Sequence, residues 1–193
     1  MTRTTPPGHR FRDPRAEKDD FLDSILVRCP RCDRPARVIS TPTLTPTPAP
    51  APDPVPAPKA KASASPVPAP PRAPSGLFAP RRLACGNCGL AKSWTGRSVV
   101  IYGSSRHQAG DPYFGLPLWL QTETRHGLIW AYDLAHLDLI KRYVQATLRE
   151  GIPWGDHGRR MTLIARLPFW MKKAGNRAEI LRAIDRIHAT LGP

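Results

Sequence analysis

The chain has 193 residues, enough for one ordinary domain or two small ones, and its 29 Lys and Arg against 15 Asp and Glu give a net charge of +14. No run approaches 18 apolar residues, and the polar, Arg-rich start lacks the apolar stretch of a signal peptide, so the sequence predicts neither a membrane span nor export. We therefore expect a cytoplasmic protein without membrane contact. The charge favours DNA or RNA as partner. It is spread along the whole chain, however, and an arginine-rich composition would explain it equally well.

The first forty residues divide into a tail and a hairpin. Residues 1–19 mix Arg, Asp, Pro and Gly without periodicity, which predicts a disordered tail. Residues 24–28 form a short β-prone run that leads into Cys29-Pro30-Arg31-Cys32, and residues 36–40 are suited to a returning strand. This pattern predicts the first half of a metal-binding ribbon.

The composition then changes abruptly. Residues 41–75 contain 13 of the 24 prolines and almost no large apolar side chain. Such a segment cannot donate regular ladder hydrogen bonds or bury enough surface to offset the entropy of ordering, so we expect a disordered Pro/Ala-rich insertion. It can be read as a ligand for a polyproline-binding module, but a tolerated loop insertion is the favoured interpretation.

The only four cysteines fall in two identical pairs of C-x2-C spacing, Cys29 with Cys32 and Cys85 with Cys88. Two such pairs supply the four thiolates of a tetrahedral zinc ion, and the sequence predicts one structural Zn²⁺ at these residues. Asp33 and Gly89 follow the pairs, where a tight turn with positive φ suits them. The alternatives are a disulfide framework, which needs an oxidising compartment, and a thioredoxin-like pair, which needs a βαβ context that neither pair has.

The long separation between the two pairs is compatible with one site. It is about three times that of a compact ribbon, but loop-closure cost grows only logarithmically and adds about 1 kcal/mol. Structural zinc contributes on the order of 10 kcal/mol. We therefore predict a zinc ribbon from residues 20–40 and 76–102, with a strand-like run at residues 98–102 and the insertion leaving from a hairpin tip.

Residues 103–193 are predicted to form a small α+β unit. Alternating apolar residues predict a β-hairpin of residues 116–122 and 126–132, with Glu123-Thr124-Arg125 as its turn. Asp133 is suited to cap a helix from Leu134 to Glu150, closed by Gly151. The apolar face expected for this helix consists of Leu134, Leu137, Ile140, Val144 and Leu148.

Helices are expected to complete the chain. A helical segment at residues 160–167 ends at Pro168, which can open a short turn through Lys173. Asn176 and Glu179 match a capping box for a last helix that runs to about Leu191. The predicted fold class is thus α+β: zinc-ribbon β-hairpins interrupted by the insertion, then a β-hairpin and two to three helices.

Two sets of side chains are candidates for contact with partners. Arginines and lysines dominate the C-terminal helices, and on one outward face they would bind phosphates, although a charged helix surface kept for solubility explains them nearly as well; these are Arg159, Arg160, Arg166, Lys172, Lys173 and Arg177. Trp119 and Trp170 are candidate aromatic contacts that can stack on bases or dock a protein. Tryptophans also fill small cores, which we favour for Trp130.

Several segments together resemble a family of small bacterial proteins, the transcription-factor-IIB-type zinc-ribbon-containing proteins. The resemblance covers residues 20–187 without the insertion, and its most specific pieces are Trp130-Ala131-Tyr132 and Leu167-Pro168-Phe169-Trp170-Met171-Lys172. Relatives are expected to carry cysteines where this chain has Glu123-Thr124-Arg125, so the resemblance does not extend to a second metal site. It implies the fold and the zinc, but no established activity.

The sequence favours binding over catalysis. Its histidines are scattered away from any serine, cysteine or carboxylate in a catalytic pattern, and His136, one turn into a helix, is expected to pack or cap. Asp156-His157 lies in a Gly-rich loop, and we interpret the two residues as polar side chains exposed to solvent rather than as a catalytic base and its partner. A four-thiolate zinc has no open position for a water. We expect no enzyme, but a nucleic-acid-binding zinc ribbon, with a zinc-stapled protein-interaction adaptor as the alternative; the sequence does not indicate the oligomeric state.

Overall fold

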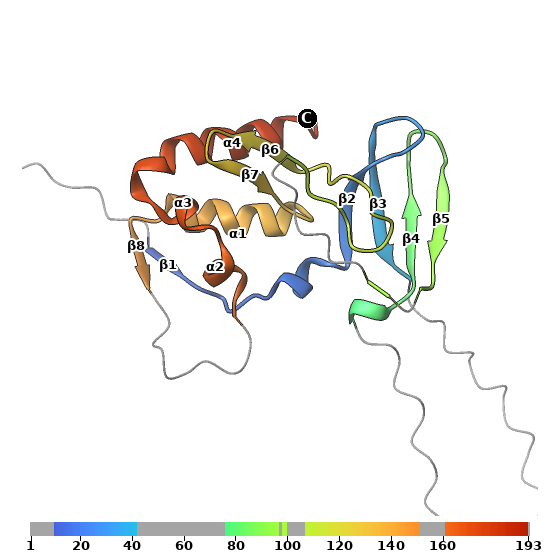
Figure 1. Cartoon of the computed structure of the whole chain (residues 1–193), viewed down its shortest axis with the longest axis horizontal. Coiled ribbons are helices and arrows are strands. Elements are labelled where there is room, and N and C mark those ends of the chain that lie inside the picture. Colours follow the sequence, from blue (N-terminus) through green and yellow to red (C-terminus); the bar gives the residue numbers. More distant parts are fainter. Residues whose placement is uncertain (1–9, 42–75, 97, 100–106, 151–160, 193) are drawn as a thin grey trace, which may run out of the picture.

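The computed structural model describes residues 10–41, 76–96, 98–99, 107–150 and 161–192. A four-stranded sheet stands at one end of the molecule, and helices with a second hairpin form the other end (Figure 1). The predicted α+β class is confirmed. The insertion, residues 100–106 and residues 151–160 lie outside the described residues, and so do the Asp156-His157 pair and most of the predicted strand at 98–102.

The ribbon sheet is an antiparallel meander of strands β2 (Ser24–Arg28), β3 (Pro35–Ser40), β4 (Arg81–Ala84) and β5 (Ala91–Trp94). The predicted first hairpin is confirmed, since β2 pairs with β3 from Ser24 opposite Ile39 to Arg28 opposite Pro35. Ser40 lies opposite Arg81 in the β3–β4 pair, and the N–H of Thr41 donates to the carbonyl of Pro80 at 2.9 Å. The two ends of the insertion therefore meet at one hairpin tip, as the sequence predicted.

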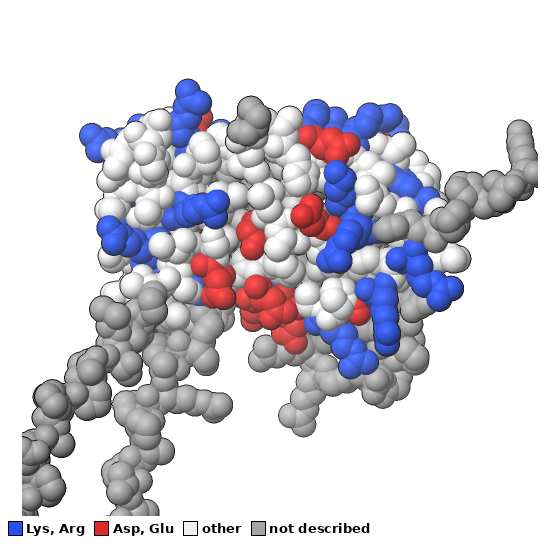
Figure 2. Space-filling model, turned by 180° about the vertical axis from the view of Figure 1, so that it is seen from behind, with Lys and Arg blue, Asp and Glu red and all other residues white. Residues whose placement is uncertain are grey.

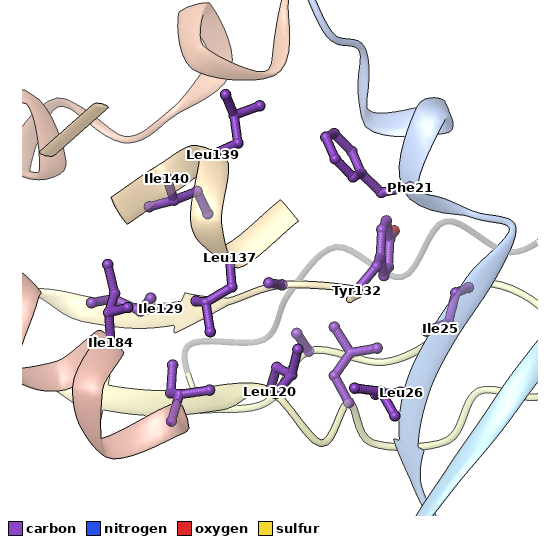
Figure 3. Packing of buried hydrophobic residues seen from close by; sticks show 14 of the residues in the cluster. Phe21, Ile25, Leu26, Leu120, Ile129, Tyr132, Leu137, Leu139, Ile140 and Ile184 are labelled. Atoms are coloured by element: carbon purple, nitrogen blue, oxygen red, sulfur yellow. The ribbon is translucent and has the colours of Figure 1, made fainter. Parts of the chain in front are cut away.

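The second unit is built from the hairpin β6 (Gln121–Thr124) and β7 (Gly127–Trp130), packed with helices α1 (Leu134–Gln145) and α4 (Arg177–Ala189). The hairpin is confirmed, but its first strand begins at Gln121 instead of residue 116. Its turn is Arg125-His126, because Thr124 already pairs with Gly127. Figure 3 shows the core, in which Leu120 and Ile129 of the hairpin region meet Leu137 of α1 and Ile184 of α4.

Strand β2 joins the two units through its backbone. The N–H of Leu26 donates to the carbonyl of Tyr132 at 2.8 Å, and the N–H of Trp119 donates to the carbonyl of Leu26 at 2.9 Å. Val27 also forms a bridge with Leu118. Both residues of this bridge are fully buried, so the core of the ribbon continues into that of the helical unit.

Order begins earlier in the chain than predicted, and the first helix ends sooner. Residues 10–19, which the sequence analysis placed in a disordered tail, contain strand β1 (Arg10–Arg12) and the start of the 3-10 helix η1 (Lys18–Phe21). Strand β1 pairs in parallel with β8 (Leu148–Glu150), which the sequence analysis had assigned to the end of α1. The cause is tertiary: Phe11 is buried edge-on against Tyr143 at a ring distance of 5.4 Å.

Helix α2 (Leu163–Arg166) is shorter than the segment predicted for residues 160–167. The short turn predicted after Pro168 is confirmed as α3 (Phe169–Lys172), which Pro168 precedes, and the 3-10 turn η4 (Ala174–Asn176) leads into α4. The capping box expected at α4 is not formed. The Asn176 amide donates to the carbonyl of Trp170 at 2.9 Å instead, and Glu179 pairs with Arg125 at 2.8 Å. Of the predicted apolar faces, Leu134 and Leu148 are exposed, whereas Ile180, Ile184 and Ile187 are buried as expected.

Candidate metal centre

Two turns at the same end of the ribbon sheet bring the four predicted cysteines together. The Sγ atoms of Cys29 and Cys88 are 3.6 Å apart, as are those of Cys32 and Cys85, and all four sulfurs lie within 4.8 Å of one another. A tetrahedral zinc with Zn–S bonds of about 2.3 Å would place its sulfurs about 3.8 Å apart. The four thiols are free, and their geometry is that of a site for one Cys-ligated metal ion.

The two turns have the same backbone construction. In the first, the N–H of Cys29 donates to Arg34 O and the N–H of Asp33 donates to Cys29 O, both at 2.9 Å. In the second, Cys85 donates to Leu90 O at 2.9 Å and accepts from the N–H of Gly89 at 3.1 Å. Each turn needs a residue with positive φ after its second cysteine.

Asp33 and Gly89 meet this requirement, as the sequence predicted, with φ of 53° and 69°. The sulfurs also receive backbone donors. The N–H of Arg31 lies 3.5 Å from the Sγ of Cys29. Such donors favour a thiolate over a thiol, and a thiolate is the form that binds a metal.

The pKa values of two neighbouring thiols are shifted in opposite directions. The backbone N–H of Arg34 is the main cause that lowers the pKa of Cys32 to about 6. For Cys88, the N–H of Leu90 is the largest influence and also acts to lower the pKa. Burial and the other three sulfurs outweigh it and raise the pKa of Cys88 to about 12. Four thiols this close cannot all ionise without a cation between them, which is what a divalent metal provides.

Trp119, a predicted aromatic contact, lies next to the first turn. The Arg28 guanidinium lies 5.0 Å from its ring and 3.4 Å from the carboxylate of Asp33. The ring is half-buried, and its indole N–H has no acceptor among the described residues. Trp119 therefore lies beside the Arg28–Asp33 ion pair at the edge of the centre.

Trp170, the other predicted contact, supports the β6–β7 turn. Its ring stacks on His126 at a centroid distance of 5.9 Å. It also lies against Gly127, where an added Cβ would come within 3.4 Å of the indole nitrogen. Gly127 has a φ of 144°, so both its conformation and the space beside it suit glycine. Trp130 packs on the core, as favoured from the sequence.

Two of the predicted basic residues of the C-terminal helices contact backbone carbonyls. Arg159 and Arg160 lie outside the described residues. The Lys172 ammonium donates to the carbonyl of Ala165 at 2.7 Å, and Arg177 donates to the carbonyl of Ala146 at 2.8 Å. Both side chains thereby satisfy the free carbonyls of neighbouring segments. Among the described members of the set, Arg166 and Lys173 are exposed.

Two buried polar residues that the sequence analysis did not single out stabilise the structure away from the cysteines. The Arg81 side chain is 1% exposed, donates to the carbonyl of Leu22 at 2.8 Å, and lies 4.6 Å from the Tyr113 ring. The Asp111 carboxylate is fully buried and accepts backbone N–H bonds at 2.7 to 2.9 Å from Tyr113, Phe114 and Leu116. The one sequence signal for Asp111 was the Asp-Pro start of a turn.

The fold and the sulfur cluster define the class: an α+β protein with a four-cysteine ribbon suited to one metal ion. No family model, curated protein or solved structure matches this chain, so the family resemblance stays a prediction. Within the described residues, no helix has the length and apolar character needed to cross a membrane.

Proposed function

We propose that the chain is a structural-zinc protein whose ribbon binds nucleic acid without catalysing a reaction. Zinc is the metal that the donor set favours, because four thiolates at tetrahedral spacing form a closed site of soft ligands. Such a site offers no position for a reacting water. A reducing cytoplasm would keep the four thiols available for the metal, and we propose that location.

The observation that carries the nucleic-acid proposal is the exposed face of the ribbon sheet. The strand register places Arg37 and Ile39 of β3 on the same face as Arg82 of β4 and Ser93 of β5. All four residues are exposed, and the four strands contain no acidic residue. In Figure 2, most of the acidic side chains on the face shown lie near its middle.

This face is suited to phosphates for two reasons. Arg82 has no partner among the described residues. Arg37 contacts the hydroxyl of Ser24 at 3.2 Å, and the carboxylate of Asp133 lies within electrostatic range of it. Both guanidinium groups are exposed and can bind an anion. The small side chains Ala91 and Ser93 leave the sheet open beside them. Arginines on an open sheet surface can contact successive phosphates of a strand.

The test is fluorescence anisotropy of labelled single- and double-stranded DNA and RNA with the zinc-loaded protein, over a series of salt concentrations. We expect the logarithm of the affinity to fall linearly with the logarithm of salt concentration. The double change Arg37→Gln with Arg82→Gln should make this slope shallower by about 2, or about 1 for each phosphate contact that is lost. Arg142→Gln on α1 is the matched control, since it removes an exposed charge elsewhere. Absence of binding at low salt would contradict the proposal.

A second candidate function, a protein-interaction adaptor, is favoured by Phe169. This ring is 74% exposed, and its only described ring contact is with the ammonium of Lys173 at 5.0 Å. Exposed aromatic side chains frequently anchor protein interfaces. The adaptor function predicts an association that persists at high salt and is lost on Phe169→Ala, whereas the Arg37 and Arg82 changes leave it intact.

A further inference from the structure

A cavity of about 110 Å³ lies in the helical unit, away from the cysteines. It is partly open to the surface and is lined by residues of η1, β7, α1, α2 and α3 together with the residues that follow α2. Its walls are mainly apolar and include Leu128, Trp130, Ile140, Leu163, Leu167 and Met171. An apolar cavity of about 150 Å³ is large enough for benzene, so this one suits a short alkyl chain.

One wall carries a buried hydrogen-bond donor. His136 is 3% exposed, and its Nδ1 accepts the N–H of Tyr132 at 3.3 Å. A neutral imidazole that accepts at Nδ1 carries its proton on Nε2. No described group accepts a hydrogen bond from this Nε2–H. The ring is held in place by Phe21, stacked at 4.8 Å, and it lines the cavity. A fixed and unused donor therefore lies at an apolar site.

The neutral state of His136 follows from its surroundings. Burial, followed by the positive charge of Lys18, lowers the pKa of His136 to about 3. The ring therefore stays uncharged at neutral pH and keeps its acceptor bond to Tyr132. Its Nε2–H is a neutral donor beside a lysine, an arrangement that suits an acceptor carrying negative charge.

Two cations line the same cavity. The Lys18 ammonium lies 5.1 Å from the Trp130 ring and 5.4 Å from the Tyr132 ring, and Arg166 of α2 also contributes to the wall. Neither forms an ion pair within the described residues, and no Asp or Glu lines the cavity. Burial lowers the pKa of Lys18; the charge of Asp19 opposes this effect and that of Arg166 adds to it. Two like charges at one apolar opening are stabilised when an anion lies between them.

We propose that this cavity binds a small organic carboxylate. The alkyl part of the ligand lies among Leu128, Leu163 and Met171, and the carboxylate is held by Lys18, Arg166 and the Nε2–H of His136. An inorganic anion would leave the apolar walls uncovered, and a neutral alkyl ligand would leave the two cations uncompensated. The two features together therefore select an amphiphilic anion.

The test is isothermal titration of the zinc-loaded full chain with alkanoates of increasing length and with the neutral amide of hexanoate. From acetate to hexanoate we expect affinity to rise about fourfold for each added CH2 group, as apolar burial requires. Hexanamide should bind at least about tenfold more weakly than hexanoate, because it lacks the charge. Equal binding of hexanamide, or no binding of any alkanoate, would overturn the proposal.

Two variants remove the positive charges of the cavity one at a time without unfolding the protein. Lys18→Met retains an unbranched apolar stem over Trp130, and Arg166→Met changes an exposed residue, so the protein should stay folded. Each should weaken hexanoate about tenfold or more without altering hexanamide. Arg186→Met, an exposed cation on α4, is the control and should leave both affinities unchanged. If hexanoate binds equally well to both pocket variants, its carboxylate is not held by these cations and the proposal fails.

Discussion

Ser40 and Arg81 face each other in the β3–β4 pair although they are 41 positions apart, and the Arg81 guanidinium donates to the Ser40 hydroxyl. The insertion thus begins and ends at a closed hairpin. Joining Thr41 to Gly76 through a Gly-Ser linker should leave the fold and the metal site intact. A loop roughly fivefold shorter lowers the closure cost by about 1.4 kcal/mol. Thermal unfolding should show equal or higher stability, and a large loss would mean that residues 42–75 stabilise the fold.

Arg81 is expected to be a stabilising residue of the ribbon. Arg81→Ala would leave the Leu22 carbonyl without its donor and remove a contact with Tyr113, so we expect a loss of about 2 kcal/mol in the free energy of unfolding. Arg81→Lys should recover less than half of the lost stability, since an ammonium cannot replace the several donors of a planar guanidinium. Urea unfolding measures both. Arg82→Ala, one position along and exposed, should change stability by no more than about 0.5 kcal/mol.

The metal centre should be required for the ribbon to fold. Cys85→Ser replaces a thiolate by a hydroxyl at a buried ligand position, so we expect loss of bound zinc and unfolding of at least β4 and β5. Zinc content by mass spectrometry and circular dichroism check this result. Ser93→Ala in β5 should retain one zinc per chain. A cooperatively melting, metal-free Cys85→Ser protein would show that the metal is dispensable.

Acid should destabilise the helical unit through His136. Because burial lowers its folded-state pKa to about 3, well below the ordinary value of 6.5, protons bind preferentially to the unfolded chain. The stabilisation is complete above about pH 6.5 and is lost as pH falls toward 3, by about 2 to 3 kcal/mol at pH 4.5. Urea midpoints of the native protein and of His136→Gln should converge over this range. Parallel pH profiles would contradict the assignment.

Strand β1 should contribute measurably to stability despite its length. Phe11→Ala removes a buried ring that packs edge-on against Tyr143, and we expect a loss of about 3 kcal/mol. Arg12→Ala, exposed on the same strand, should have little effect. Denaturant unfolding of both variants provides the comparison. Equal stability of Phe11→Ala and the native protein would show that residues 10–12 do not stabilise the fold, as the predicted disordered tail implies.

The parts predicted correctly are those set by local chemistry. Cysteine spacing, the positive φ of Asp33 and Gly89, and the Asp133 cap, which accepts from the N–H of His136 at 2.7 Å, all depend on residues a few positions apart. The end of α1 at Gln145 could not be predicted from neighbouring residues. Residues 148–150 fit a helical pattern, and only the distant strand β1 gives them a reason to be extended.

The candidate site divides along the same line. The four cysteines were evident because ligand type and spacing specify a metal site directly. The basic residues were identified by composition, which does not show that Lys172 and Arg177 donate to backbone carbonyls. Nor does the sequence show that Lys18, Arg166 and His136, from three separate segments, line one cavity.

The parallel pairing of β1 with β8 also constrains the order in which a newly made chain can fold. Residues 10–12 are made before the ribbon, but their partners, residues 148–150, are made only after the ribbon. The ribbon can close around its metal once the chain has emerged as far as Trp94, because strands β2 to β5 end there and all four cysteines come before it. Among the described strands, β1 is made first but pairs with a segment made near the end, so the ribbon can bind its metal before β1 pairs with β8.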